Sequence, residues 1–106
     1  MNKSKLVRTL HILNEAEMKE LLHFIQSSYF SRNSNIVKLY NILKTHYPDF
    51  KSRSLTNEKV FKKLFPARAY AHQQLLNLTS EFNRLLEKYL IIRQLEKEKM
   101  LEQKLL

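Results

Sequence analysis

The residues of this chain best suited to chemistry lie in one stretch, FKKLFPARAY, residues 61–70. It holds three aromatic rings and three cations, Lys62, Lys63 and Arg68. Cations of this kind can hold phosphate oxygens, and exposed rings can stack on bases. The alternative is that the stretch is a corner of a core, with its rings buried where the chain turns at Pro66.

Helical spacing separates the rings from the cations. Phe61, Leu64 and Phe65 recur at intervals that place them on one face of a helix, and Pro66 ends that helix. We expect these three side chains to point inward, with Tyr70 packing on them, and the cations to face water. The rings would then not be available for stacking.

The positive charge of the chain is uneven. The formal net charge is +9, and residues 51–72 carry six basic residues against one acidic residue, a local net of +5. A local positive field raises the encounter rate with nucleic acid, although a well-solvated helix surface is the simpler explanation. If this segment is an interface, its candidate phosphate contacts are Lys51, Arg53, Lys59, Lys62, Lys63 and Arg68.

The composition excludes several classes of function. The chain has no cysteine, which excludes disulfides, thiol catalysis and Cys-ligated zinc. It has no glycine, so phosphate-cradling loops of the P-loop and Rossmann kinds are not expected. We find no apolar run of about 18 residues and no signal-peptide pattern, so we expect no membrane span and a cytoplasmic location.

Neither the histidines nor the carboxylates form a catalytic or metal-binding pattern. The four histidines lie far apart, and no two occupy the i, i+4 positions that bring imidazoles together on one helix face. Glu15, Glu17 and Glu20 cluster where a helix is expected to begin, and the helix dipole favours negative charge there. We therefore predict no catalytic, cofactor-binding or metal-binding residues, and we do not expect an enzyme.

Apolar residues recur at helical spacing along most of the chain, which predicts an all-α domain of about five helices. Asn14 followed by Glu17 matches a capping box, and Thr56 is a second expected N-cap. Tyr47–Pro48 and Pro66 are expected to end the third and fourth helices. In chain order the apolar stripes lie at residues 6–13, 18–25, 36–43, 60–65 and 75–92.

The fifth predicted helix is too long for a compact domain. It begins near residues 69–72 and contains no proline or glycine up to the last residue. Thirty-five helical residues rise about 52 Å, whereas a domain of this size has a radius of gyration near 13 Å. We expect residues 1–93 to form a bundle with four short helices packed on the long one, and residues 94–106 to project from it.

The projecting segment needs an explanation, because it offers Leu95, Leu101 and Leu105 as contacts for a partner helix. One explanation is pairing with another chain, including self-association. The other is that the helix leads into a further region of a longer protein, and we prefer this second explanation. The predicted core comprises Leu10, Leu13, Leu21, Phe24, Ile25, Tyr29, Phe30, Leu39, Leu43, Phe50, Phe61, Leu64, Phe65, Tyr70, Leu75, Leu78, Phe82, Leu85 and Tyr89.

Between residues 10 and 91 the chain carries a series of short elements that together form a recognisable pattern. They are Glu20-Leu21, Phe24-Ile25, Ser27, Tyr29-Phe30, Leu39-Tyr40, Tyr47-Pro48, Phe50, Leu55-Thr56, Glu58, Val60-Phe61, Leu64-Phe65-Pro66, Tyr70, Leu75, Leu78, Ser80, Phe82, Leu85, Glu87 and Tyr89-Leu90. In these elements the chain resembles the N-terminal part of a group of mainly helical Bacteroidota proteins without an assigned activity. The resemblance implies a helical module at the front of a longer chain. Ser31 and Ala71 depart from the pattern, where Asn and Asp are expected, and the second departure puts the start of the last helix in doubt.

Two functions remain open at this point. Short helices on one long helix, without cleft chemistry, favour a protein-interaction or scaffolding module of a larger protein. The alternative is a DNA-binding, helix-turn-helix-like pair formed by the fourth helix and the start of the fifth, although its corner lacks the usual glycine. Gln, Asn and Arg side chains can pair with base edges, and the polar face of the last helix carries Gln73, Asn77, Ser80 and Arg84.

Overall fold

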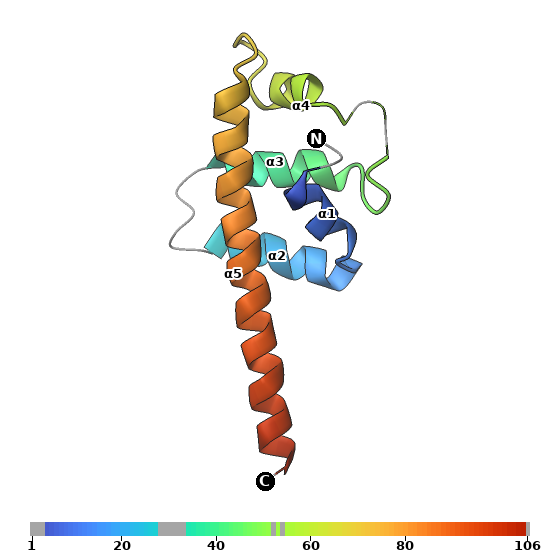
Figure 1. Cartoon of the computed structure of the whole chain (residues 1–106), viewed down its shortest axis with the longest axis vertical. Coiled ribbons are helices and arrows are strands. Elements are labelled where there is room, and N and C mark those ends of the chain that lie inside the picture. Colours follow the sequence, from blue (N-terminus) through green and yellow to red (C-terminus); the bar gives the residue numbers. More distant parts are fainter. Residues whose placement is uncertain (1–3, 28–33, 52, 54, 106) are drawn as a thin grey trace.

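The described part of the chain folds into five α-helices, as the sequence predicts. The computed structural model describes residues 4–27, 34–51, 53 and 55–105, with side chains up to residue 99, and contains no strand in these ranges. The last helix is much the longest, and four short helices pack on it (Figure 1). The helices are α1 (Lys5–His11), α2 (Glu15–Ser27), α3 (Ser34–Lys44), α4 (Asn57–Leu64) and α5 (His72–Leu105).

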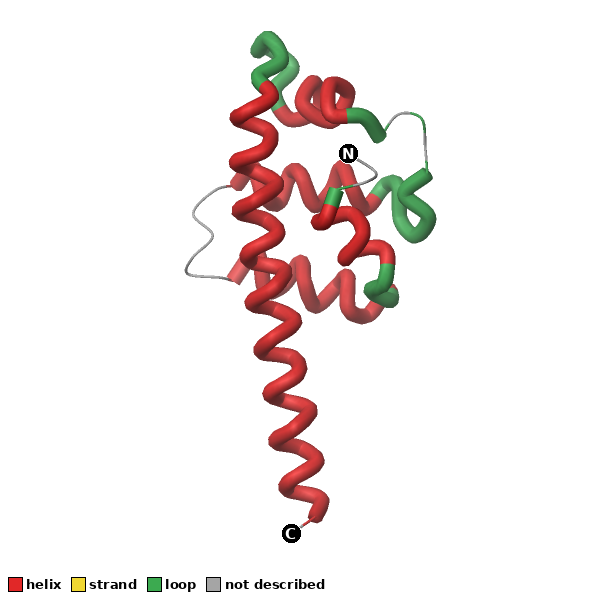
Figure 2. The backbone as a smooth tube through the Cα atoms, in the orientation of Figure 1, coloured by secondary structure: helices red, strands yellow, loops and turns green. Residues whose placement is uncertain are grey.

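Helix α5 forms the axis of the molecule. Each of α1 to α4 contacts it, and further contacts join α2 to α3 and α3 to α4. In Figure 2, α4 lies near the beginning of α5, α3 and α2 cross it further along, and the C-terminal part continues beyond α2. The molecule is therefore elongated, with principal dimensions of 58 × 29 × 18 Å.

The helix starts are capped by local hydrogen bonds. The Asn14 side chain accepts from the Glu17 amide at 2.8 Å, and the Glu17 carboxylate accepts from the Asn14 amide at 3.0 Å. This reciprocal pair is the predicted capping box, and it starts α2 at Glu15. Thr56 caps α4 as expected, and Ser4 caps α1 by accepting from the Val7 amide.

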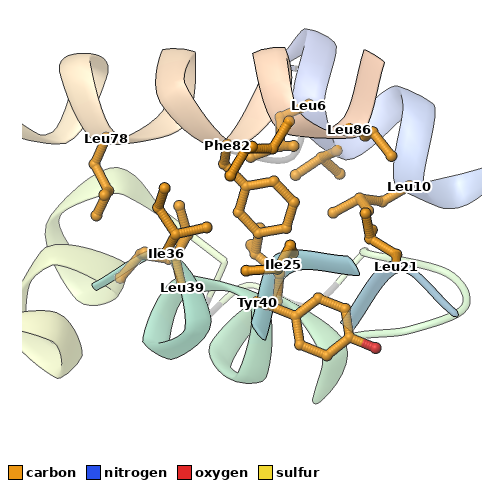
Figure 3. Packing of buried hydrophobic residues seen from close by; sticks show 14 of the residues in the cluster. Leu6, Leu10, Leu21, Ile25, Ile36, Leu39, Tyr40, Leu78, Phe82 and Leu86 are labelled. Atoms are coloured by element: carbon orange, nitrogen blue, oxygen red, sulfur yellow. The ribbon is translucent and has the colours of Figure 1, made fainter. Parts of the chain in front are cut away.

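The core fills the space between the short helices and α5. Phe82 points from α5 toward Ile25 of α2 (Figure 3), and its ring stacks on that of Tyr40 at 6.4 Å. The Tyr40 hydroxyl is buried and donates to the Met18 carbonyl oxygen at 2.7 Å, so burying it leaves no unpaired donor. Leu86, which the predicted stripe leaves out, lies beside Leu6 and Leu10 of α1 and is fully buried.

Some predicted core positions are wrong. Tyr70 is 41% exposed, because the chain turns outward after Pro66 before α5 begins at His72. Ile92, the last residue of the predicted stripe, is 44% exposed because the short helices end before it. Phe24 and Phe65 are half-buried against the core, whereas Tyr29 and Phe30 lie outside the described residues.

The turn after α3 ties α1 to the rest of the bundle. Helix α3 ends at Lys44, before the predicted stop at Tyr47–Pro48, and a turn follows it. The Tyr47 hydroxyl donates to the Leu13 carbonyl oxygen at 2.8 Å, and the Pro48 carbonyl oxygen accepts from His11 Nδ1 at 2.7 Å. These two bonds join segments more than thirty residues apart.

Candidate functional site

The predicted phosphate contacts lie on and around α4. This amphipathic helix buries Val60, Phe61 and Leu64 and turns its lysines to solvent. The structure exposes every one of the six predicted cations: Lys51, Arg53, Lys59, Lys62, Lys63 and Arg68.

These six cations are not neutralised. Within the described part of the chain, none of them forms an ion pair. Glu58 is the one acidic residue between positions 51 and 72. The positive field of this end of the molecule is therefore directed to solvent.

The corner between α4 and α5 joins three aromatic rings. The Phe61 ring is 5.1 Å from that of Phe65 and 5.4 Å from that of Tyr70, measured between centroids, and it meets Tyr70 edge-on. The Tyr70 hydroxyl is hydrogen-bonded to His72 Nδ1 at 2.8 Å. The Arg68 guanidinium lies over the Phe65 ring, 5.0 Å from its centroid. We call Lys62, Lys63, Phe65, Arg68 and Tyr70 the basic corner.

The predicted base-contacting row on α5 is divided into two parts. Gln73 and Asn77 are exposed near the start of the helix, and the Gln73 amide donates to the Asn77 side-chain oxygen at 2.9 Å. Arg84 lies about three helical turns further along and lines a groove shared with α1. At that groove Lys5 pairs with Glu87 at 3.2 Å. The structure thus brings Arg84 next to α1 and not next to the α4 cations.

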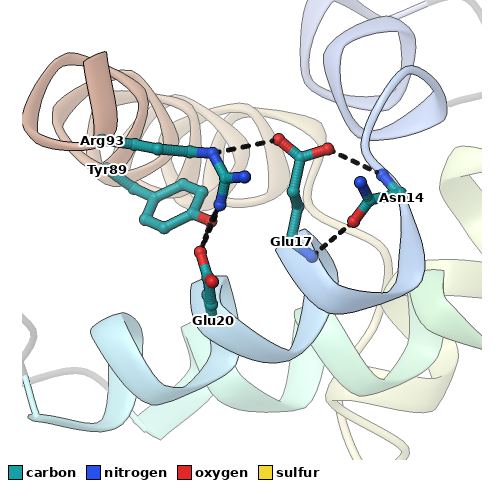
Figure 4. Close-up of polar contacts among 5 residues, drawn as sticks. All are labelled: Asn14, Glu17, Glu20, Tyr89 and Arg93. Atoms are coloured by element: carbon teal, nitrogen blue, oxygen red, sulfur yellow. Dashed lines mark hydrogen bonds and ion pairs between the residues drawn. The ribbon is translucent and has the colours of Figure 1, made fainter. Parts of the chain in front are cut away.

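A polar cluster, which the sequence did not reveal, fastens α5 to α2 where α5 leaves the bundle (Figure 4). Tyr89 donates to the Glu20 carboxylate at 2.6 Å, and Arg93 lies between Glu17 and Glu20 and binds both. The hydrogen bond from Tyr89 and the charge of Arg93 hold the pKa of Glu20 below its usual value of 4.5. Burial, followed by the bond to Glu20, raises the pKa of Tyr89 to about 12. We call these four residues the α2–α5 clasp.

At the clasp and directly after it, α5 exposes large apolar side chains to solvent. Ile91 is 60% exposed, Ile92 44% and Leu95 58%. Leu95 is a predicted partner contact, and the side chains of the other two, Leu101 and Leu105, lie outside the described set. Ile91 and Ile92 follow Tyr89, the end of the buried stripe, and both face solvent although their residue types are apolar.

The described residues contain no group of three or more His, Asp or Glu side chains placed to hold a metal ion. His46 is half-buried, and burial together with the charge of Lys63 lowers its pKa below the usual 6.5. None of the described helices combines the length and the apolar character needed to cross a bilayer.

No family model, no curated protein and no solved structure matches the chain.

Proposed function

We propose that the chain is a non-enzymatic helical interaction module, and that the protruding end of α5 binds an α-helix of a partner protein. The observation that supports this proposal most directly is the exposure of Ile91, Ile92 and Leu95 on the two turns where α5 leaves the bundle. Exposed large apolar side chains that adjoin one another on a helix are typical of protein contacts.

The geometry favours a helical partner. The backbone groups of α5 are bonded within the helix, so a partner has to bind through side chains and cannot add a β-strand. Ile91 and Leu95 are four residues apart and lie on the same face. The α2–α5 clasp fixes the same two turns of the helix that carry this apolar surface, which lowers the entropic cost of presenting it.

The charges next to this surface argue for a partner that is not a second copy. The following described residues, from Glu96 to Lys99, alternate Glu and Lys and are all exposed. The seam of a coiled coil alternates steps of three and four residues, so the step of four from Ile91 to Leu95 is followed by a step of three to Glu98. The step of three from Ile92 to Leu95 is followed by a step of four to Lys99. A self-paired coiled coil would place these charges in its apolar seam, which destabilises it.

A peptide selection tests this proposal. A displayed library of amphipathic helices of about 20 residues, each roughly 30 Å long, is selected on the full chain. It is then counter-selected on the Ile91→Gln/Leu95→Gln variant. We expect enriched peptides with an apolar i, i+4 pattern that bind the parent chain and not the variant.

The matched control is Leu76→Gln, which removes a 41% exposed leucine near the other end of α5 and should retain binding. Equal recovery of peptides on the parent chain and on the Ile91→Gln/Leu95→Gln variant would overturn the proposal. Sedimentation velocity over a wide range of concentration adds a second test. A dimer that the same double substitution abolishes would mean that the partner is a second copy.

Contact with duplex DNA is the weaker candidate. The exposed cations of α4 and its neighbouring loops support phosphate binding, but Gln73 and Asn77 already bond to each other. A duplex lying along the polar face of α5 would also meet Ser4 and Lys5 of α1 beside Arg84. Binding through α5 in a major groove therefore requires both of these arrangements to change.

A further inference from the structure

We propose that the basic corner is a binding site for single-stranded nucleic acid, with phosphates held by Lys62, Lys63 and Arg68 and a base stacked on Tyr70. This function is separate from partner binding at the protruding end of α5. It concerns the opposite end of the long axis, where α4 meets the start of α5 (Figure 1).

Positive charge is concentrated at the end of the molecule that carries the basic corner. Residues 51–72 carry six basic residues and one acidic residue, a net of +5, whereas residues 94–105 carry three lysines and three glutamates, a net of zero. The cations of the first segment form no ion pair with any described residue. A polyanion is therefore attracted to this end and not to the protruding end.

Tyr70 offers an aromatic ring to solvent and is held in place by its neighbours. Tyr70 is 41% exposed, yet its ring meets that of Phe61 edge-on at 5.4 Å and its hydroxyl is hydrogen-bonded to His72. A ring that is both exposed and fixed can stack on a base without losing further side-chain freedom. Nearby, Arg68 on the half-buried Phe65 ring shows that the corner already binds a flat cation on an aromatic face.

The groups available at the basic corner suit a single strand better than a duplex. In a duplex the base faces are stacked on one another, and a protein reads the base edges in the grooves. The base-edge candidates Gln73 and Asn77 are paired with each other, and Arg84 lies in the groove with α1. An exposed ring beside unpaired cations suits bases whose faces are free, which is the pattern of single-strand binding sites.

Fluorescence anisotropy on the full chain tests the proposal. The probes are a labelled oligothymidine and an oligouridine of about 12 nucleotides, within the usual footprint of such sites, and a duplex of equal length. We expect both single strands to bind more tightly than the duplex, with affinity that falls steeply between about 50 mM and 200 mM salt. Vesicles containing an anionic phospholipid should not compete.

Two substitutions locate the site. Tyr70→Leu should weaken single-strand binding roughly 5- to 100-fold, the usual effect of removing one stacking ring, and leave duplex binding unchanged. Tyr70→Phe keeps the ring, loses only the hydroxyl, and should retain most of the affinity. Lys62→Glu/Lys63→Glu should abolish binding, whereas Lys97→Glu/Lys99→Glu makes the same charge change on the protruding end and should reduce it little. Circular dichroism checks that each variant is folded.

Several results would overturn the proposal. These are no binding at low salt, a duplex bound as tightly as the single strands, or equal affinity of Tyr70→Leu and the parent chain. Competition by anionic vesicles would indicate a membrane surface, and equal losses from the two Lys→Glu pairs would indicate attraction by net charge alone.

Discussion

The Tyr89 hydroxyl of α5 donates a 2.6 Å hydrogen bond to the Glu20 carboxylate of α2. Arg93, one turn later, donates to the same carboxylate and to the Tyr89 hydroxyl. Among the side chains of α5 that the structure describes, Tyr89 is the last buried one, so this bond marks the point where the helix leaves the bundle. The clasp therefore determines the direction in which the apolar surface at Ile91 and Leu95 projects.

Replacing Tyr89 with Phe keeps the ring in the core and removes the bond to Glu20. We expect the free energy of unfolding to fall by about 1 kcal/mol, the usual contribution of one hydrogen bond. Urea denaturation monitored by circular dichroism measures the change. Tyr70→Phe is the matched control because its hydroxyl is exposed, and it should change stability by less than about 0.5 kcal/mol. Equal losses in the two variants would contradict a specific role for the clasp.

The clasp should also make stability depend on acidic pH. The pKa of Glu20 is lowered in the folded chain, first by the hydrogen bond from Tyr89, so the unfolded chain takes up its proton at a higher pH. The stabilisation is present above pH 4.5 and is lost as pH falls through the lowered folded pKa. Urea denaturation over a pH series should give a flatter curve below pH 4.5 for Glu20→Gln.

A double-mutant cycle checks the assignment of this slope. Because Tyr89 is the main cause of the lowered Glu20 pKa, Tyr89→Phe should also flatten the curve of stability against pH below pH 4.5. Combining it with Glu20→Gln should add little further flattening, since both substitutions remove the same interaction. Independent, additive effects would show that the two residues are not coupled.

The pKa of His46 should report the charge of the basic corner. Its pKa lies below 6.5, first because the ring is half-buried and second because Lys63 is near. Lys63→Gln should raise the titration midpoint of His46, measured by NMR of the imidazole ring, but leave it below 6.5 because burial persists. Lys62→Gln removes the same charge one residue away and should shift it less. A midpoint that moves equally in both variants would contradict the placement of Lys63 beside His46.

The lowered pKa of His46 also determines how the stability of the folded chain changes with pH. A lowered pKa means that the folded chain resists protonation of His46, while the unfolded chain accepts a proton near 6.5. The contribution to stability is therefore complete above pH 6.5 and is lost as pH falls through the folded pKa. Lys63→Gln should make this loss of stability smaller without changing its sign, because it reduces the gap between the two pKa values.

Local signals in the sequence were sufficient to predict the helices. The capping box of Asn14 and Glu17 and the cap at Thr56 act within three residues, so spacing alone identifies them. The length of α5 followed from the absence of Pro and Gly. Its projection followed from comparing that length with the size of a domain.

Contacts between distant segments could not be predicted in this way. Glu20 and Arg93 are 73 positions apart, and nothing in either local pattern indicates that α2 and α5 cross at these residues. Tyr70 was assigned to the core because aromatic residues usually pack inward, but the path of the chain between α4 and α5 carries it outward. Both features belong to the candidate site. The aromatic part of the site and the clasp could therefore be identified only from the structure.

Leu86 shows within one helix that a local sequence pattern does not reveal contacts with distant segments. The predicted stripe follows Leu85 and Tyr89, whereas α1 packs on α5 beside that stripe and buries Leu86 completely. Leu86→Ala should therefore lower the free energy of unfolding by about 2–5 kcal/mol, since it opens a cavity next to Leu6 and Leu10. Leu76→Ala is the matched control on the same helix, and its 41% exposed side chain should cost less than about 1 kcal/mol. Urea denaturation of both variants decides the matter, and similar losses would mean that α1 does not cover Leu86.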